Sequence, residues 1–137
     1  METFEITVET SLCARHRLRG VPADKGGLHS HVWTIRASLQ SRSLDETGWV
    51  VDFEQASSAL EAVVRPYKDR YLNETSPFDM VNPTREKIAK HLFETLSSII
   101  DKWNHPRGAL VAYMPRVHLY RIDIIEGTKT ASYLVRS

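Results

Sequence analysis

The hydrophobic periodicity changes along this chain in an order that few folds can accommodate. Residues 3–9, TFEITVE, alternate apolar and polar side chains, which is the two-residue period of a half-buried strand. A second strand pattern covers residues 28–40, two stretches of helical period follow, and strand patterns return at residues 117–125 and around Tyr133. We therefore predict an α+β domain of order strand–strand–helix–helix–strand–strand, with an antiparallel sheet and both helices on one face.

Both helical stretches carry start and stop signals. Asp52 precedes the first helix, where its carboxylate can cap free backbone N–H groups, and Pro66 should end or kink that helix. The second helix should begin at the NPT motif, capped by either Asn82 or Thr84, and the NHPRG motif should stop it. The apolar residues expected to face the core are Phe53, Ala56, Leu60, Val63 or Val64, Tyr67, Ile88, Leu92, Leu96, Ile99 or Ile100, and Trp103.

The size and charge of the chain exclude several classes of protein. Its 137 residues suit a single domain spanning residues 1–137, without a linker or a repeat. A net charge of +1 with scattered basic residues argues against a nucleic-acid partner, and no stretch approaches the roughly 18 apolar residues of a membrane span. The single cysteine, Cys13, excludes an intrachain disulfide, and the METFEITVET segment lacks signal-peptide features, so we expect a cytoplasmic protein.

Two histidines separated by one residue, His29 and His31, stand in the second predicted strand. Alternate strand residues share a face, so the two imidazoles should lie about 7 Å apart along the chain. A metal ion would need a third ligand, and His16 on the preceding strand is the candidate. Three neutral imidazoles leave the fourth position of Zn²⁺ open, as in catalytic zinc sites. Cys13 should face the other side of its strand, and the alternative interpretation of the histidine pair is two exposed or hydrogen-bonded strand residues. The other histidines, His91, His105 and His118, are interpreted as helix-surface, helix-end and strand-face residues.

Six short segments, collinear over nearly the whole chain, carry a resemblance to a known family: ARHRL, LHSH, TGWVVDF, YLN, NPTREKIAK and IIEGTKTASY. On these segments the chain resembles the 6-pyruvoyl-tetrahydropterin synthase and 6-carboxytetrahydropterin synthase family. The resemblance implies a tunnelling fold, in which subunits assemble into an oligomeric β-barrel, typically a homohexamer of two stacked trimers. It also implies a Zn²⁺ site formed by His16, His29 and His31, and a small-molecule substrate, 7,8-dihydroneopterin triphosphate or a related pterin, bound between subunits.

The resemblance further implies a substrate-binding role for Glu126. In the family, a glutamate at the matching position holds the guanidinium-like edge of the pterin. A carboxylate suits this task because it can accept two parallel N–H hydrogen bonds from a planar amino-pyrimidine. Without the resemblance, Glu126 would be interpreted as a solvated turn residue.

The catalytic part of the family pattern is not preserved. The family's usual base is a cysteine shortly before the histidine pair, supported by an Asp–His pair just before the YLN position. Here the PADKGGL segment has no cysteine and places Lys25 in that region, whereas Lys68 and Asp69 occupy the Asp–His positions. Ser30 also replaces the family's glycine between the two histidines. These departures leave the fold and the zinc ligands intact and put the reaction class in doubt.

Three functions remain compatible with the sequence. The first is a zinc-dependent lyase on a pterin triphosphate, with Asp69, Lys25 or a zinc-bound hydroxide as the base; Glu54 and Asp24 are weaker candidates. The second is the same scaffold and metal serving a different reaction or substrate in a specialised biosynthetic pathway. The third is a non-catalytic module that binds a pterin, a purine or a metal. A reused enzyme should keep an ionisable group within hydrogen-bond reach of the ligand, whereas a binding module need not.

Overall fold

The order of helices and strands is the predicted one. The computed structural model describes residues 2–104 and 117–136. A four-residue helix and one 3-10 turn, at residues 72–74, lie in segments predicted as connections, and a second 3-10 turn at residues 65–67 follows the first long helix. The elements are β1 (Phe4–His16), α1 (Ala23–Gly26), β2 (His29–Ser41), α2 (Phe53–Val64), η1 (Arg65–Tyr67), η2 (Leu72–Glu74), α3 (Arg85–Asn104), β3 (His118–Glu126) and β4 (Lys129–Leu134).

Strands β1 and β2 pair with each other over their whole length. They run antiparallel, from Phe4 opposite Ser41 to His16 opposite His29. Along β1, buried positions alternate with exposed ones up to His16, so one face of the strand points into the core. β1 is therefore longer than the predicted segment 3–9, because the alternation continues through the LCARH segment.

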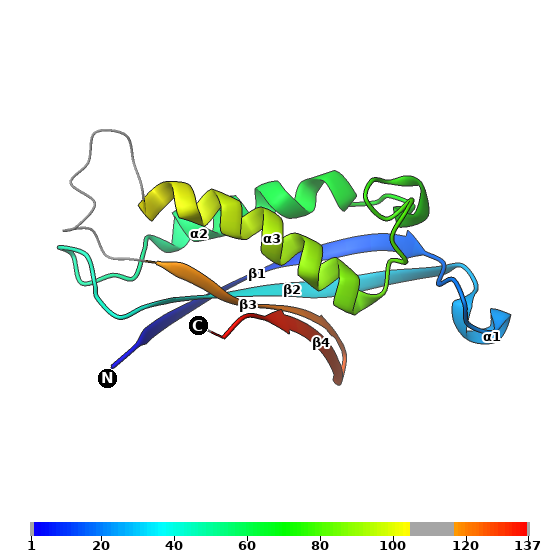
Figure 1. The fold of residues 1–137 in the computed structure, drawn as a ribbon, viewed down its shortest axis with the longest axis horizontal. Coiled ribbons are helices and arrows are strands. Elements are labelled where there is room, and N and C mark those ends of the chain that lie inside the picture. Colours follow the sequence, from blue (N-terminus) through cyan, green and yellow to red (C-terminus); the bar gives the residue numbers. More distant parts are fainter. Residues whose placement is uncertain (1, 105–116, 137) are drawn as a thin grey trace.

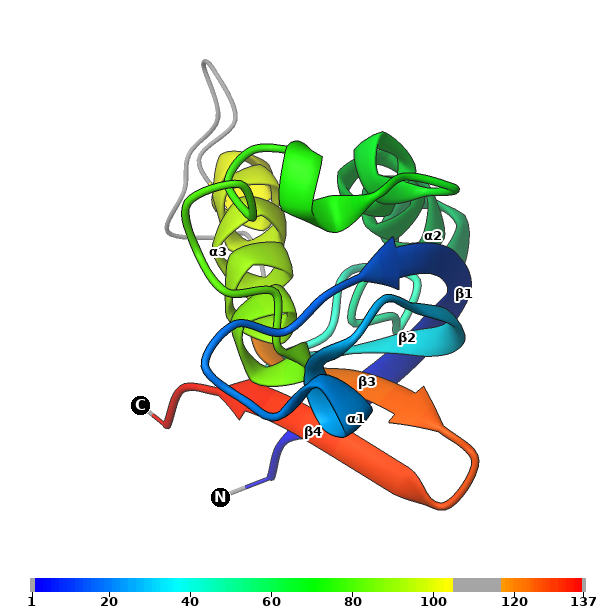
Figure 2. The same ribbon diagram turned by 90° about the vertical axis from the view of Figure 1, so that its right-hand side faces the viewer.

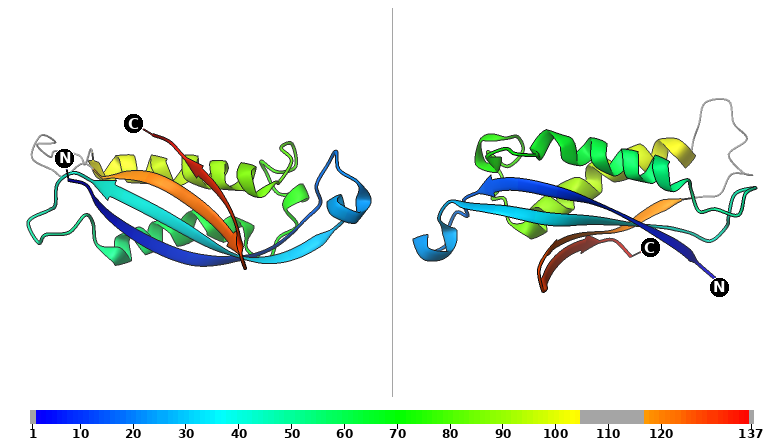
Figure 3. Two further views of the ribbon diagram at one scale, coloured as in Figure 1. Left: turned by 90° about the horizontal axis from the view of Figure 1, so that it is seen from below. Right: turned by 180° about the vertical axis from the view of Figure 1, so that it is seen from behind.

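Strands β3 and β4 complete a four-stranded antiparallel sheet of order β1-β2-β3-β4. The turn between them contains Gly127 at φ 58°, a backbone conformation that glycine adopts without steric cost. β1 and β4 form the two edges of the sheet, as the view from below in Figure 3 shows. The sheet is therefore open in the single chain.

Helices α2 and α3 lie on the same face of the sheet (Figure 1), and Figure 2 shows both from the end at which α1 lies. The predicted cap of α2 is confirmed, because the Asp52 carboxylate accepts a hydrogen bond from the Glu54 N–H at 2.8 Å. The helix ends at Val64, and Pro66 follows in η1, as predicted. No helix in residues 2–104 or 117–136 is long and apolar enough to cross a membrane.

Of the two candidate caps for α3, the structure selects Thr84. Its hydroxyl accepts a hydrogen bond from the Lys87 N–H at 3.2 Å, and the helix begins at the next residue. The side chain of Asn82 instead forms two hydrogen bonds with the backbone of Arg19. Its Oδ1 accepts from the Arg19 N–H at 2.8 Å, and its Nδ2 donates to the Arg19 C=O at 3.1 Å. This pair of hydrogen bonds ties the segment before α3 to the chain that follows β1.

The hydrophobic core lies between the sheet and the two helices. The predicted helical stripes are largely confirmed, but Phe53, the first residue of α2, is exposed rather than buried. Ile99 and Trp103 are only partly buried at the margin of the core. The largest fully buried side chains are Leu12, Trp33, Ile35, Leu39, Leu60, Leu72, Phe78, Ile88, Leu92, Leu96, Ile100 and Ile122.

The buried side chain of Asn104 joins the end of α3 to the start of β3. Its Oδ1 accepts from the Val117 N–H at 2.9 Å and its Nδ2 donates to the Val117 C=O at 2.6 Å. We predict that Asn104→Ala lowers the free energy of unfolding by roughly 2–4 kcal/mol, because both peptide groups lose their partner in a buried setting. Urea denaturation at fixed protein concentration measures this loss.

The exposed neighbour Lys102 provides the control for this prediction. Lys102→Ala should change the free energy of unfolding by no more than about 0.5 kcal/mol. An Asn104→Ala protein as stable as Lys102→Ala would show that these two hydrogen bonds do not matter for folding.

Candidate active site

The three histidines singled out from the sequence lie together at one end of the β1–β2 pair. His16 is the last residue of β1 and lies opposite His29, the first residue of β2. His31 follows two positions later and therefore shares the helix-covered face of the sheet. Only 4% of His16 is exposed, whereas His29 and His31 are half-buried.

The imidazole rings are close to one another and pack against Trp33. The ring centroids of His16 and His31 are 4.8 Å apart, and those of His29 and His31 are 5.9 Å apart. The Trp33 ring stacks on His31 at 5.0 Å and meets His16 edge-on at 5.3 Å. The Trp33 side chain is fully buried, and its indole N–H has no hydrogen-bond partner among the described residues. The indole ring therefore forms a rigid wall beside two of the histidines.

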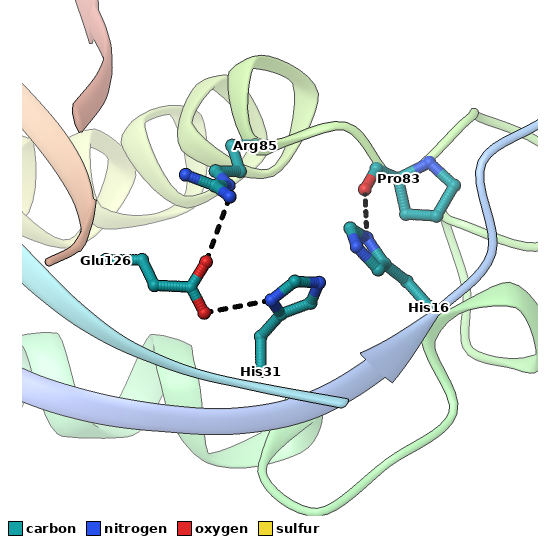
Figure 4. A network of polar contacts seen from close by, with 5 residues as sticks. All are labelled: His16, His31, Pro83, Arg85 and Glu126. Atoms are coloured by element: carbon teal, nitrogen blue, oxygen red, sulfur yellow. Dashed lines mark hydrogen bonds and ion pairs between the residues drawn. The ribbon is translucent and has the colours of Figure 1, made fainter. Parts of the chain in front are cut away.

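Hydrogen bonds determine the tautomers of His16 and His31. The Nδ1 atom of His16 lies 2.8 Å from the carbonyl oxygen of Pro83, and that of His31 lies 2.9 Å from Oε2 of Glu126 (Figure 4). A carbonyl and an ionised carboxylate can only accept, so Nδ1 is the protonated nitrogen in both rings. In the neutral rings, the lone pair is then on Nε2. This is the arrangement that metal-ligating histidines usually have.

Glu126 links His31 to the first residue of α3. While Oε2 contacts His31, Oε1 accepts a hydrogen bond from the Arg85 Nη2 at 3.0 Å (Figure 4). The hydrogen bond from His31 lowers the pKa of Glu126, and the positive charges of Arg85 and Lys129 lower it further. Glu126 is therefore a carboxylate at neutral pH.

The surroundings of His16 favour its neutral form. Burial lowers the pKa of His16, and electrostatic interaction with His31, His29 and Arg85 lowers it further, although the hydrogen bond to Pro83 acts in the opposite direction. A neutral imidazole is the form that binds metal ions. The same surroundings that hold this ring in place thus keep its Nε2 lone pair free.

Three imidazoles are suitable ligands for zinc, but in this structure the three rings do not point toward one common position. In the present side-chain conformations, the described residues contain no group of three His, Cys, Asp or Glu that could hold a metal ion. Two imidazoles on one tetrahedral zinc have ring centroids roughly 5 Å apart. The observed separations of 4.8 and 5.9 Å straddle this value, so a zinc site would need reorientation of rings that are already neighbours.

The two residues proposed as bases lie in connecting segments. Lys25 is exposed in α1. Asp69 is exposed after η1, has a positive φ of 59°, and donates its backbone N–H to the Cys13 carbonyl at 2.6 Å. Within the described part of the chain, neither side chain forms a hydrogen bond or an ion pair with the three histidines. Of the weaker candidates, Glu54 is exposed and the side chain of Asp24 is outside the described set.

One of the remaining histidine predictions needs correction. His91 is not simply a helix-surface residue: it is partly buried, and its Nε2 lies 2.7 Å from the Tyr67 hydroxyl. Burial lowers the pKa of His91 and raises that of Tyr67, so both are neutral around pH 7.

His118 is exposed on β3 as predicted, whereas His105 is outside the described residues. Cys13 is exposed, on the face of β1 opposite His16, which confirms its exclusion from the histidine group.

Sequence reasoning missed two participants in this site, Arg85 and the carbonyl of Pro83. Both belong to the NPTREKIAK segment, and Arg85 is 41 residues from Glu126 in the chain. The position of Arg85 at the predicted start of a helix was visible in the sequence, but its contact with Glu126 depends on how α3 lies over the sheet.

A cavity of about 670 Å³ lies away from the histidines, near the end of β2 at Ser41, and Arg42 and Phe93 are among the residues that line it.

A comparison with family models decides the relationship of this chain to known proteins. The model described as 6-pyruvoyl tetrahydropterin synthase matches residues 5–137, nearly the entire chain. The chain belongs to this family. A curated relative, the 6-carboxy-5,6,7,8-tetrahydropterin synthase of Bacillus subtilis, is 25% identical over 108 residues, which cover 72% of this chain and 69% of that protein.

Solved structures agree with this assignment at the level of the fold. The 6-pyruvoyl tetrahydropterin synthase of Caenorhabditis elegans superposes with a TM-score of 0.75 at 21% identity, covering 99% of this chain and 98% of that one. The Plasmodium vivax enzyme, in a variant with a substituted catalytic glutamate, gives 0.71 at 15% identity, covering 97% and 98%. The predicted tunnelling fold is confirmed for the subunit, and the family consists of pterin synthases.

Proposed function

We propose that this protein is a zinc-dependent enzyme with carbon–oxygen lyase chemistry on 7,8-dihydroneopterin triphosphate or a related pterin. The observation that carries the proposal is the pair of hydrogen bonds that leave Nε2 free on two adjacent histidines, one of them bonded to Glu126. Membership of the 6-pyruvoyl tetrahydropterin synthase family makes a pterin the expected ligand class.

In this proposal the described residues bind both the metal and the ligand. His16, His29 and His31 hold zinc, which when bound would act as a Lewis acid toward side-chain oxygens of the ligand. Glu126 accepts the paired N–H donors of the pterin edge, which fixes the orientation of the ring. Pro83 and Glu126 hold the imidazole rings of His16 and His31 through Nδ1.

Asp69 is the better supported of the two candidate bases, Asp69 and Lys25. A non-glycine residue at positive φ is uncommon, and such backbone outliers cluster at functional sites. Its backbone is bonded to Cys13, three residues before His16, so Asp69 lies beside the strand that carries one histidine. In the Plasmodium vivax variant the substituted catalytic residue is a glutamate, so a carboxylate serves catalysis in that relative.

A second candidate function is a different reaction on the same scaffold, in a specialised biosynthetic pathway. The observation that favours it is the PADKGGL segment, which lacks the cysteine that the family resemblance leads us to expect. In that case Asp69 or Lys25 would serve another substrate, while the histidines and Glu126 keep their tasks.

We also propose that the active unit is a cytoplasmic homo-oligomer, a hexamer built as a dimer of trimers. β1 and β4 are the edge strands of the sheet, and no further strand of the described residues pairs with their outer edges. The outer edge of β1 is occupied near Cys13 and Arg15, which hydrogen-bond to the backbone of Asp69 and Arg70. Such edges favour pairing with another chain, and pairing β1 of one copy with β4 of the next would continue the sheet toward a closed barrel. Light scattering should therefore give six times the 15.7 kDa chain mass, whereas a monomer would refute the assembly.

For the metal, we predict that His29→Ala abolishes stoichiometric zinc binding and leaves a folded protein. His29 is less buried than His16, and its ring packs only against His31 among the described ring contacts, so its loss should cost little stability. Elemental analysis after dialysis gives the zinc content, and circular dichroism reports folding. His118→Ala, which removes an exposed strand histidine, is the matched control. A folded His29→Ala protein with full zinc content would refute the metal assignment.

For the reaction, zinc-loaded protein incubated with 7,8-dihydroneopterin triphosphate should release triphosphate and form a new pterin, detected by mass spectrometry. We expect Asp69→Asn to lower kcat by about 10²–10⁴-fold, the usual contribution of a general base. Lys25→Met should act comparably only if Lys25 is the base instead. A family member that retains the cysteine serves as positive control.

Together with a calorimetric measurement of pterin binding, the outcomes of that experiment separate the three functions. Turnover supports the lyase. Tight pterin binding without turnover, with the control active, indicates a binding module. Neither binding nor turnover, with zinc present, indicates a scaffold adapted to another substrate.

A further inference from the structure

The carboxylate proposed to hold the pterin already has both of its oxygens in use. Oε1 of Glu126 accepts from the Arg85 guanidinium at 3.0 Å, and Oε2 accepts from His31 at 2.9 Å (Figure 4). The Arg85 side chain is 24% exposed and that of Glu126 is 36% exposed, so the pair lies at the boundary between interior and solvent.

The guanidinium of Arg85 has the same donor geometry as the edge of an amino-pyrimidine. Both are planar N–C–N groups that present parallel N–H donors to a carboxylate. A pterin that places its amino-pyrimidine edge on Glu126 therefore competes with Arg85 for Oε1. In an exchange, the ligand's edge would take the place of the guanidinium on Oε1, while Oε2 keeps its contact with His31.

The displaced guanidinium needs a new partner. Arginine stays protonated under all ordinary conditions, and an unpaired guanidinium at a half-buried site is costly. Among the described residues, Glu126 is the carboxylate with which Arg85 forms an ion pair, and no second acidic group contacts it. A negatively charged group on the ligand would supply such a partner.

We infer that Arg85 is a specificity residue that selects an anionic ligand. It occupies Glu126 in the ligand-free protein, and it pairs with a phosphate or carboxylate of the ligand once the heterocyclic edge has taken its place. The ligand class is thus a planar heterocycle with an amidine-like or guanidine-like edge and an anionic substituent. This inference rests on the proposed pterin-binding role of Glu126 and adds a requirement for charge.

The chain offers a matched control for this ion pair. Arg36 and Glu9 also form an Arg–Glu pair, with Nε and Oε1 2.8 Å apart, between neighbouring strands. The two residues face each other across β1 and β2, at positions that alternate with the buried core residues. Arg36→Gln therefore removes a comparable charge without touching the histidines or Glu126.

The test compares the dissociation constants of two ligands by calorimetry. The ligands are 7,8-dihydroneopterin, which has an uncharged side chain, and its triphosphate. The proteins are the wild type, Arg85→Gln, Arg36→Gln and Glu126→Gln, each with its zinc content measured. Inorganic phosphate serves as a third, pterin-free probe.

We expect the wild type to bind the triphosphate at least about tenfold more tightly than 7,8-dihydroneopterin, and Arg85→Gln to remove most of that preference. The uncharged ligand should bind Arg85→Gln at least as tightly as the wild type, because it no longer displaces a guanidinium. Arg36→Gln should keep the wild-type preference. Glu126→Gln should weaken the binding of both ligands.

Two results would overturn the inference. One is an unchanged preference in Arg85→Gln; the other is an equal loss of affinity for both ligands, which a purely structural role would produce. If the wild type binds neither pterin, the proposed function fails and inorganic phosphate decides the role of Arg85. A phosphate dissociation constant about tenfold weaker in Arg85→Gln would sustain its anion-binding role, and equal constants would reject it.

Discussion

The antiparallel pairing of β1 with β2 is the constraint on which the site depends. Side chains alternate between faces with a period of two, so a one-residue slip between the two strands would put His16 on the opposite face from His29 and His31. The register that places His16 opposite His29 is held along the whole strand pair by the buried residues Leu12, Trp33 and their neighbours. Burial of apolar side chains along the strand pair thereby determines where the three histidines lie at its end.

Helix α3 contributes the second half of the site through its first residues. Thr84 caps the helix. The carbonyl of Pro83, just before it, accepts from His16, and Arg85, just after it, contacts Glu126. Packing of the buried residues Ile88 and Leu92 fixes the position of this helix against the sheet. The orientation of two imidazoles therefore depends on the same core that stabilises the fold.

The sequence allowed the order of elements, the shared face of the histidines and the Asp52 cap to be predicted, because each depends on local periodicity or spacing. It left the cap of α3 open between Asn82 and Thr84, since both residue types are found as helix caps. In the structure, the side chain of Asn82 instead bonds to the backbone of Arg19, a tertiary contact that the sequence does not reveal. The Arg85–Glu126 pair escaped prediction because no local pattern encodes a contact between a helix start and a distant strand end. Phe53 was wrongly predicted to be buried, because the apolar pattern of α2 was extended to the first residue of the helix, which lies outside the core.

The candidate bases and the histidines belong to different kinds of structure. Lys25 and Asp69 lie in short connections, whereas His16, His29 and His31 are built into paired strands. Connections tolerate substitution far better than a register-locked sheet does. Natural selection could therefore exchange the proton-transferring residue of such a protein without rebuilding its ligand-holding centre. A single stable scaffold of this kind is suited to divergence, in which related enzymes share one anchoring geometry and differ in the bond they break.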